Sequence, residues 1–570
     1  MFETFLNYLI VMILGVMLHY IGMLSGRINK KLGYFVEILC GLLTICYIFY
    51  VHSFPDGFTY FGLLAYCYAS AIELRPHKTS YNKVKEQLIA AQVEEMQLFR
   101  DKKRVVIDVL IFFVTFAFAI LFLIYGPKES SILKYIITLG FITFFTELVK
   151  RIHIAKNVKC YYDHDNAEIF ILSKYESRKI PVIECINLQL ETSVDILKLH
   201  PLFTLFTSNV DFTTSNRDVL KIEMPGETLY LTLNDSKKWV DIFSLYMKNQ
   251  PAETMNVLPF YHKKNIKRLI GKLYFATTVK GVSAYSALLL ILYFLQVPTW
   301  GLVLAGISYW ILNIMISDVV LKVAMDAKAI TNQEIISVAD PIFKKAGLSN
   351  VKLYETESSD YNGLATGMNI GRGMITLTSQ TLKLPLDTIE GIIAHESIHL
   401  KKRDIMWTQI WRICFLLILL VTLIPIIQNI DNIESLKTPL FLLIWLLMMI
   451  FPTYLSFVSQ WMEVRADHLG GELLKGGHIQ MANSLRTLTI AQDNALNKSL
   501  EYQMLNDKDE NVSSSLERES WILRIISFQF MPHPPMYWRV QTLQTNKDGW
   551  GKGILKQWLR DRWKETVSKK

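Results

Sequence analysis

The chain has 570 residues and a formal net charge of +9, with 51% hydrophobic and only 19% charged side chains, whereas soluble proteins carry about 25% charged residues. This low charge and a mean hydropathy of +0.25 exclude a disordered or purely soluble protein. Six cysteines in 570 residues are too few for a disulfide scaffold, and the lack of CxxC spacing disfavours a cysteine zinc site.

Long apolar segments predict a polytopic α-helical membrane protein, because a membrane-spanning helix needs about 20 mainly apolar residues. About nine spans are predicted, at residues 5–25, 33–52, 57–74, 107–126, 131–149, 281–297, 300–321, 410–428 and 438–459. The sequence therefore predicts an N-terminal membrane region with about five spans over 1–149 and a membrane hairpin over 271–325.

The distribution of basic residues predicts the orientation, because Lys and Arg are enriched in cytoplasmic loops. The loop 26–32 carries three basic residues and the loop 75–104 carries eight, whereas the intervening hairpin loops carry only Lys128 and Lys437. Nine spans then place the N-terminus outside the cell and the C-terminus in the cytoplasm. The direct partner is the lipid bilayer; no basic and aromatic face of the kind that binds nucleic acid is evident.

A strand-rich cytoplasmic insert is predicted over residues 150–270. Runs of alternating, β-branched residues predict strands at 168–173, 180–190, 219–224 and 228–233, followed by a helix at 236–248. Strands closed by one helix resemble a pleckstrin-homology-like (PH-like) barrel, but another small α+β module is the favoured interpretation.

Two further segments have amphipathic character. Residues 79–100 predict one helix that lies on the membrane or on the rest of the protein. The basic tail, residues 546–570, has Trp558 and Trp563 among lysines and arginines, which predicts an interfacial helix on an anionic membrane surface.

The residues that indicate chemistry begin with His395-Glu-Ser-Ile-His399, on a predicted helix that starts near Pro385. Residues four apart share one face of a helix, so both imidazoles can bind one metal ion while Glu396 lies beside it to handle a proton. A catalytic zinc ion takes three protein ligands. Just after the last predicted span, Glu463 can complete the metal shell and Asp467 can orient a ligating histidine.

In their order along the chain, these motifs resemble the integral-membrane zinc metallopeptidases of the HtpX and CAAX prenyl endopeptidase type, over about residues 265–545. The matching segments are Asn362-Gly-Leu-Ala365-Thr-Gly, His395-Glu396-x-x-His399 followed by Asp404, Glu463-x-x-Ala-Asp467, and His533-Pro-Pro-x-x-x-Arg539. The resemblance implies a zincin-like α+β catalytic domain over 326–545, which the membrane hairpin 410–459 interrupts.

The resemblance also implies roles for individual residues. One zinc ion per chain would be bound by His395, His399 and Glu463, with Glu396 as the general base. Asn362 and Ala365 would belong to an edge strand that binds the substrate backbone, Arg539 would contact substrate, and His533 would assist catalysis at the oxyanion. Gly363-Leu364 stands where the family more often has Ala-Phe, which we expect to alter side-chain selectivity.

The expected function is cleavage of membrane-associated proteins or peptides at the cytoplasmic face of a bacterial plasma membrane. Three alternatives stay open: a CAAX-type prenyl-peptide endopeptidase, a protease dedicated to one secreted, signal or antimicrobial peptide precursor, and an inactive sensor or scaffold. The intact Glu396 argues against the last alternative. The oligomeric state and the role of residues 1–265 stay open.

Overall fold

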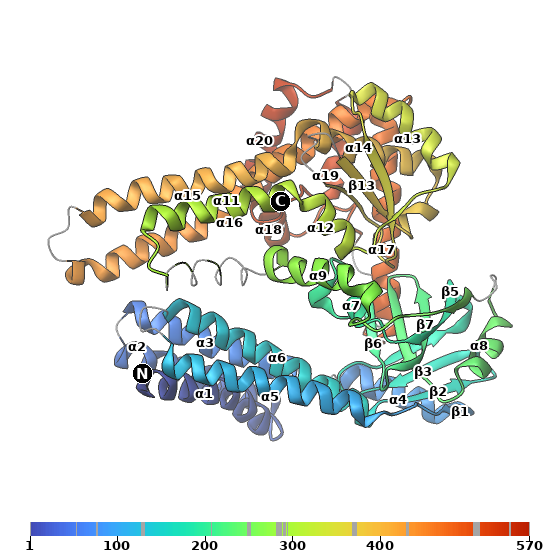
Figure 1. The fold of residues 1–570 in the computed structure, drawn as a ribbon, viewed down its shortest axis with the longest axis horizontal. Helices are drawn as coiled ribbons and strands as arrows, with labels where there is room; N and C mark the ends of the chain where they lie inside the picture. Colours follow the sequence, from blue (N-terminus) through green and yellow to red (C-terminus); the bar gives the residue numbers. More distant parts are fainter. Residues whose placement is uncertain are drawn as a thin grey trace.

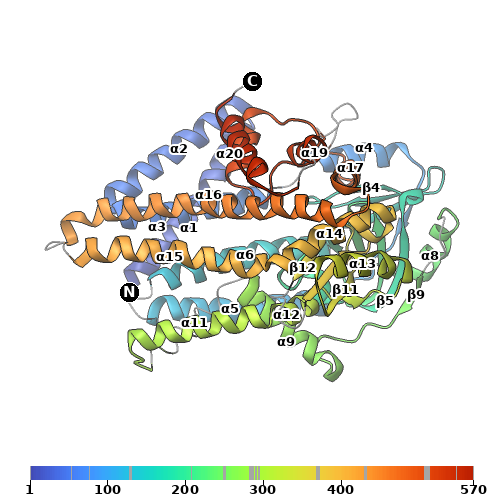
Figure 2. The ribbon, with the colours of Figure 1, turned by 90° about the horizontal axis from the view of Figure 1, so that it is seen from above.

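The computed structural model describes residues 2–52, 54–75, 78–126, 131–206, 208–247, 252–280, 288, 292, 295–366, 373–428, 433–505, 514–546 and 549–568. Long helices run roughly along the longest axis, and two globular parts lie at the same end of these helices (Figure 1). The view from above shows the same arrangement (Figure 2). We call the two parts the strand-rich module (residues 93–98 and 158–255) and the C-terminal domain (residues 326–403 and 460–568).

The long helices form two groups. The N-terminal group contains α1 (Phe2–Gly26), α2 (Lys30–Val51), α3 (Phe54–Glu73), α5 (Lys102–Tyr125) and α6 (Ser131–Asn157). The second group contains α11 (Thr299–Met315), α12 (Ser317–Ala324), α15 (Asp404–Gln428) and α16 (Ile433–Leu473).

The prediction of nine spans is not confirmed as a count. Among the described residues, three helices are long and apolar enough to cross a membrane, and α11 with α12, bent by 61°, is a fourth if the pair is one span. The other predicted ranges, 57–74, 131–149, 410–428 and 438–459, lie in α3, α6, α15 and α16. The predicted span 281–297 lies largely outside the described residues.

The strand-rich module consists of two sheets and a closing helix. The first sheet has the order β1-β2-β3-β4 and the second β6-β8-β7-β5-β9. The first contains β1 (Val93–Met96), β2 (Lys159–Asp163), β3 (Glu168–Leu172) and β4 (Arg178–Pro181). The second contains β5 (Asn187–Ser193), β6 (Asn209–Phe212), β7 (Arg217–Met224), β8 (Glu227–Thr232) and β9 (Ala252–Met255).

The predicted strands and helix of the module occur at the expected places, except that one predicted strand is divided into two. The run 180–190 splits into β4 and β5 because a turn of 3-10 helix at Val182–Glu184 separates them. Helix α8 (Ser236–Ser244) buries Trp239 and Phe243 against the core of the sheets.

The segment 79–100 is not one helix. Helix α4 spans Lys78–Ala90, and β1 then pairs in antiparallel register with β2. Met96 is buried in the core of the strand-rich module. The hydrogen-bonding edge of β2 therefore outweighs the helical spacing of Val93 and Met96, and the module begins before the first residue predicted for it, 150.

The C-terminal domain combines a four-stranded sheet with helices. The sheet order is β10-β11-β13-β12. Its strands are β10 (Lys328–Ala329), β11 (Val351–Thr356), β12 (Gly363–Thr366) and β13 (Gly373–Thr378). Its further helices are α13 (Gln333–Ala346), α14 (Leu386–Lys402), α17 (Gly477–Tyr502), α18 (Trp521–Gln529), α19 (Met536–Thr545) and α20 (Lys552–Val567). Among the described residues β12 pairs with β13 alone, so β12 is an edge strand.

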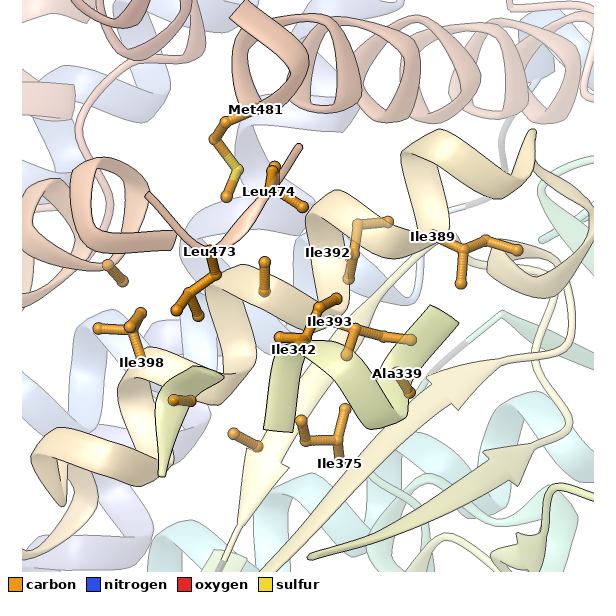
Figure 3. Packing of buried hydrophobic residues seen from close by; sticks show 14 of the residues in the cluster. Ala339, Ile342, Ile375, Ile389, Ile392, Ile393, Ile398, Leu473, Leu474 and Met481 are labelled. Carbon is orange, nitrogen blue, oxygen red and sulfur yellow. The ribbon is translucent and has the colours of Figure 1, made fainter. Parts of the chain in front are cut away.

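Aliphatic side chains fill the space between this sheet and the helices above it (Figure 3). Isoleucines of α14 pack against α13 and β13 on one side and against the end of α16 and the start of α17 on the other. The buried residues include Ala339, Ile342, Ile375, Ile389, Ile392, Ile393, Ile398, Leu473, Leu474 and Met481. Helix α14 is thus held on several sides, which fixes the side chains on its remaining face.

The C-terminal tail packs on protein. Helix α20 buries Trp558 completely, together with Ile554, against Val464, Phe528 and Trp538. The prediction that Trp558 lies in a membrane surface is therefore wrong, because the neighbouring helices supply the apolar contact that a bilayer would otherwise provide. Trp563, on the same helix, is exposed.

Candidate metal centre

Helix α14 brings the two histidines of the HExxH motif to one face. The helix starts after Pro385, carries Asp387 in its first turn, and ends at Arg403, whose φ of 55° is left-handed. This turn returns the next residue, Asp404, toward the helix, and Asp404 Oδ2 lies 2.8 Å from His399 Nδ1.

Helix α16 crosses α14 closely at the first histidine. A Cβ atom added to Gly470 would lie 3.3 Å from the Cα and N atoms of His395 and 2.7 Å from Met481 Cε. Glycine permits this approach because it has no side chain at the crossing. The crossing brings Glu463 and Asp467, both N-terminal to Gly470 on α16, beside the histidines.

Three potential ligand atoms converge at this crossing. The Nε2 atoms of His395 and His399 are 3.0 Å apart, and they lie 3.4 and 3.3 Å from the two carboxylate oxygens of Glu463. All three ligand atoms lie within 4.8 Å of one another. Within the part of the chain that the structure describes, no other group of three His, Cys, Asp or Glu residues has such geometry.

Carboxylates also contact the outer nitrogen of each imidazole. His395 Nδ1 lies 2.9 Å from Asp467 Oδ1, and His399 Nδ1 is in the same way close to the carboxylate of Asp404. Arg539 donates from Nε and Nη2 to the two oxygens of Asp467, at 2.8 and 2.7 Å. Asp467 is therefore held in place by a bidentate ion pair, the strongest geometry for such a contact.

The electrostatics of the cluster favour bound positive charge. Burial alone would raise the pKa of Asp467, but the charge and hydrogen bonds of Arg539 outweigh burial and lower this pKa to about 2. Burial alone would lower the pKa of His395, but its bonds to Asp467 and Glu463 raise it to about 9. The pKa of Glu463 falls well below its usual value, because the neighbouring histidines outweigh its burial.

The residues present fit a divalent cation such as zinc. Two imidazole nitrogens and one carboxylate form the donor set of many catalytic zinc sites. Each imidazole has a carboxylate at its second nitrogen, which fixes the ring and leaves the inner nitrogen as the ligand. The predicted ligands His395, His399 and Glu463 are thus brought together, and the predicted supporting residue Asp467 lies where it can orient His395.

A cavity with a volume of about 610 Å³ opens beside this cluster. The edge strand β12 forms one wall, and the backbone N–H of Ala365 donates to Glu396 Oε2 at 2.7 Å. Asn362, at the start of the strand, also lines the cavity. The structure thus places Glu396, Asn362 and Ala365 around one hollow next to the candidate ligands.

His533 and Arg539 line the same cavity but differ in surroundings. His533 is 60% exposed, and its Nδ1 lies 3.0 Å from Glu463 Oε2. Arg539 is buried, binds Asp467, and lies 3.4 Å from Glu463. The main contact of Arg539 in this structure is therefore the carboxylate that supports His395, a contact that the sequence did not indicate.

Gly363 affects the packing of the cavity wall. A Cβ atom at Gly363 would lie 2.7 Å from Ile392 Cγ2 on α14 and 3.2 Å from Leu377 Cδ2. A larger residue at position 363 would therefore push β12 away from α14. The following residue, Leu364, packs near Met325, Tyr354 and Met374.

Two residues that shape the site, Asp404 and Gly470, have no role that the sequence motifs predict. The role of Asp404 depends on the left-handed turn at Arg403, which the sequence does not display as a motif. Gly470 follows Asp467 by three residues. A glycine one helical turn after a motif that supplies metal ligands is the sequence signal for a close crossing of two helices.

The comparisons with known proteins agree with this geometry. Residues 329–547 match peptidase family M48, and residues 159–247 match a bacterial PH domain. The first match confirms the predicted resemblance, and the second favours a PH-like fold for the strand-rich module over another small α+β module.

Similar curated proteins are homologues of protease HtpX. The chain is 33% identical over 118 residues to one from Listeria monocytogenes, which covers 19% of this chain and 39% of that protein. It is 39% identical over 64 residues to one from Pelotomaculum thermopropionicum, which covers 11% of this chain and 23% of that protein. The chain thus spans about two fifths of the length of the Listeria relative. Among solved structures, S. mikatae Ste24p is similar with 19% identity and a TM-score of 0.35, covering 49% of this chain and 65% of that chain.

Proposed function

We propose that the chain is a zinc-dependent membrane endopeptidase, because residues 329–547 match peptidase family M48 and similar curated proteins are HtpX homologues. The observation that carries this proposal is the cluster of His395, His399 and Glu463 beside Glu396, in a cavity walled by an edge strand. An inactive sensor would not need a carboxylate at this position.

Zinc bound by the three ligands would supply Lewis-acid chemistry, which polarises a carbonyl and lowers the pKa of bound water toward about 7. The protein residues would move the protons. Glu396 takes the proton of the attacking water on its carboxylate and later gives that proton to the leaving amine. The hydrogen bond from Ala365 keeps this carboxylate turned toward the substrate strand.

Two side chains of the opposite wall are suited to the developing negative charge. His533 is exposed to the cavity and close to Glu463, so its imidazole can turn to donate a hydrogen bond to the oxyanion. Arg539 contributes mainly through Asp467, and its charge lies close enough to the cluster to favour the same oxyanion.

Strand β12 is suited to bind an extended substrate. One side of β12 pairs with β13, and no strand among the described residues pairs with the other side; the backbone N–H of Ala365 on this strand donates to Glu396. A peptide added to this edge would take main-chain hydrogen bonds, a mode of recognition that tolerates many side chains. We therefore expect an endopeptidase with modest sequence preference.

Metal analysis and one conservative variant test this function. Purified wild-type protein should contain one zinc ion per chain, and His399→Ala or Glu463→Ala should lose it. Glu396→Gln should keep zinc and lose proteolysis by several powers of ten, because the general base is gone. Glu390→Gln, on the same helix but outside the cavity, is the matched control and should cleave normally. Normal cleavage by Glu396→Gln would contradict the proposed mechanism.

We also propose that the site faces the cytoplasm and acts on membrane-associated substrates. In a background without the six native cysteines, a single cysteine at the exposed Ser337 should resist an impermeant thiol reagent in intact cells, whereas one at Asn432, in a predicted outer loop, should react. The reverse pattern would place the site outside.

The substrate class is tested by comparing membrane peptides from wild-type and Glu396→Gln cells. Cleavage of many unrelated proteins indicates general proteolysis, whereas one accumulating precursor or a set of prenylated peptides indicates a dedicated role.

A further inference from the structure

The segment that precedes the edge strand is held by the strand-rich module. Strand β11 ends at Thr356, and the connecting segment Glu357–Asn362 leads directly into β12. We call residues 357–362 the connecting loop. Its backbone continues into Ala365, which contacts Glu396, so the position of this loop affects the edge strand.

Contacts at three successive loop residues join it to the module. Lys198 Nζ lies 2.7 Å from Glu357 Oε2, and the buried Lys221 also forms an ion pair with Glu357. The hydroxyls of Ser208 and Ser358 are 3.3 Å apart.

The third contact is the most enclosed. The hydroxyl of Thr228 on β8 is hydrogen-bonded to the hydroxyl of Ser359, and both side chains are buried. The backbone N–H of Ser359 also donates to Ser208 Oγ at 3.3 Å. Buried hydroxyls cost free energy when they lose their partner, so this contact fixes the loop more than an exposed one would.

The loop is also bonded within its own domain, where the backbone N–H of Ser358 donates to Ser379 Oγ at 3.3 Å and that of Asn362 donates to Thr378 Oγ1 at 3.1 Å. A cavity of about 760 Å³ lies next to it, lined by residues of both the strand-rich module and the C-terminal domain, among them Ser208, Lys221 and Glu357. The loop is therefore held across this interface largely by the polar contacts just described.

Helix α17 makes a second connection between the same parts. Near its C-terminal end, Ser499 donates to Glu227 and Tyr502 donates to Glu184, both in the module. Closer to the centre of the same helix, Gln492 Nε2 donates to the carbonyl of Tyr361 in the connecting loop at 2.7 Å. The module and α17 thus hold the loop from two directions.

We propose that the strand-rich module positions the substrate-binding edge strand, with Thr228 and Ser359 as positioning residues for the proposed peptidase reaction. Strand β12 has only four residues and is paired on one side, so the loop at its start determines how it is presented to an extended peptide. This inference rests on the proposed function and assigns the module a role inside the enzyme.

The test removes one hydroxyl without changing the shape of the side chain. Thr228→Val in the full-length, zinc-loaded protein should raise KM for fluorescein-labelled casein by about three- to tenfold, with a smaller change in kcat, because substrate binding to the strand weakens. Ser359→Ala should act in the same way, and Thr228→Ser should restore the wild-type KM.

The same strand offers a matched control. Thr232, on β8, is also buried, and its hydroxyl bonds to Thr214 inside the module, 2.8 Å away. Thr232→Val removes an equivalent hydroxyl without touching the loop, so KM should stay at the wild-type value. Zinc content and thermal unfolding should be alike in the Thr228→Val and Thr232→Val variants.

A readout without catalysis separates this inference from the proposed function. Hydrogen–deuterium exchange of peptides covering residues 360–366 should become faster in Thr228→Val and Ser359→Ala, and should not change in Thr232→Val. If wild-type protein does not cleave casein but this exchange pattern appears, the proposed function fails and the positioning role stands. Unchanged exchange and KM in both loop variants, or equal effects in Thr232→Val, would overturn the inference.

Discussion

Removing one partner of the ion pair between Asp467 and Arg539 should destabilise the fold strongly, because the other charge is left buried without it. Both side chains are buried and joined by two hydrogen bonds, and Asp467 also contacts His395. Asp467→Leu leaves the guanidinium of Arg539 buried, with the carboxylate of Glu463 3.4 Å away. Removing one partner of a buried pair costs about 3–5 kcal/mol, and we expect the lower end because Glu463 compensates partly.

The double variant should be less damaged than the sum of the single variants. In Asp467→Leu with Arg539→Met no charge of the pair is left unpaired, and apolar replacements of buried pairs are often close to neutral. We expect the double variant to lose at least about 2 kcal/mol less stability than the two single variants lose together, within the range of measured coupling energies.

The zinc affinity should respond differently from the stability. Every variant that lacks Asp467 should bind zinc about 10- to 100-fold more weakly, because His395 loses the carboxylate that orients it. Unfolding of chelator-treated protein in mixed detergent micelles measures the stability, and competition with a zinc-binding dye measures the zinc affinity. Arg518→Met, which removes a more exposed ion pair, is the control and should cost below about 1 kcal/mol. Additive losses in the double variant would refute the reasoning.

Three further predictions follow from packing and protonation. Gly470→Ala should cost about 1–3 kcal/mol and weaken zinc binding measured by dye competition, whereas Gly553→Ala, with nothing within 4 Å, should be neutral. Trp558→Ala should lower the free energy of unfolding in detergent by about 3–5 kcal/mol, whereas Trp563→Ala, at an exposed position, should not. Equal small effects of the two substitutions would argue against the packing of α20. Burial lowers the pKa of His468 from 6.5 to about 4, so the unfolded chain binds this proton more readily. Stability should fall as pH drops from about 6.5 to 4, by at most roughly 3 kcal/mol, a slope that His468→Phe should remove in unfolding measured across that range.

Spacing along a helix predicted the candidate metal ligands, but it did not predict the residues that support them. His395, His399 and Glu463 were found because residues four apart share a face and a zinc ion needs three ligands, both local rules. The contact of Arg539 with Asp467 joins α19 to α16, and no local pattern encodes such a pairing.

The two amphipathic segments show why a local pattern is not enough. Residues 79–100 have helical spacing throughout, yet Val93–Met96 pair with β2 because that strand offers an open edge. Trp558 fits a membrane surface by composition, but α20 finds apolar partners on three other helices. In both cases the partner is remote in sequence, so the outcome depended on tertiary contacts.

If the proposed peptidase function holds, the unbroken course of α16 sets how far from the membrane the chain can cleave a substrate. The helix continues from the predicted span 438–459 to Glu463 without interruption, so the ligand lies only about 6 Å beyond the apolar segment at 1.5 Å per residue. An extended peptide covers that distance with about two residues. A scissile bond therefore has to come within a few residues of the bilayer surface. A stably folded soluble protein meets that requirement only after the region around the bond has unfolded.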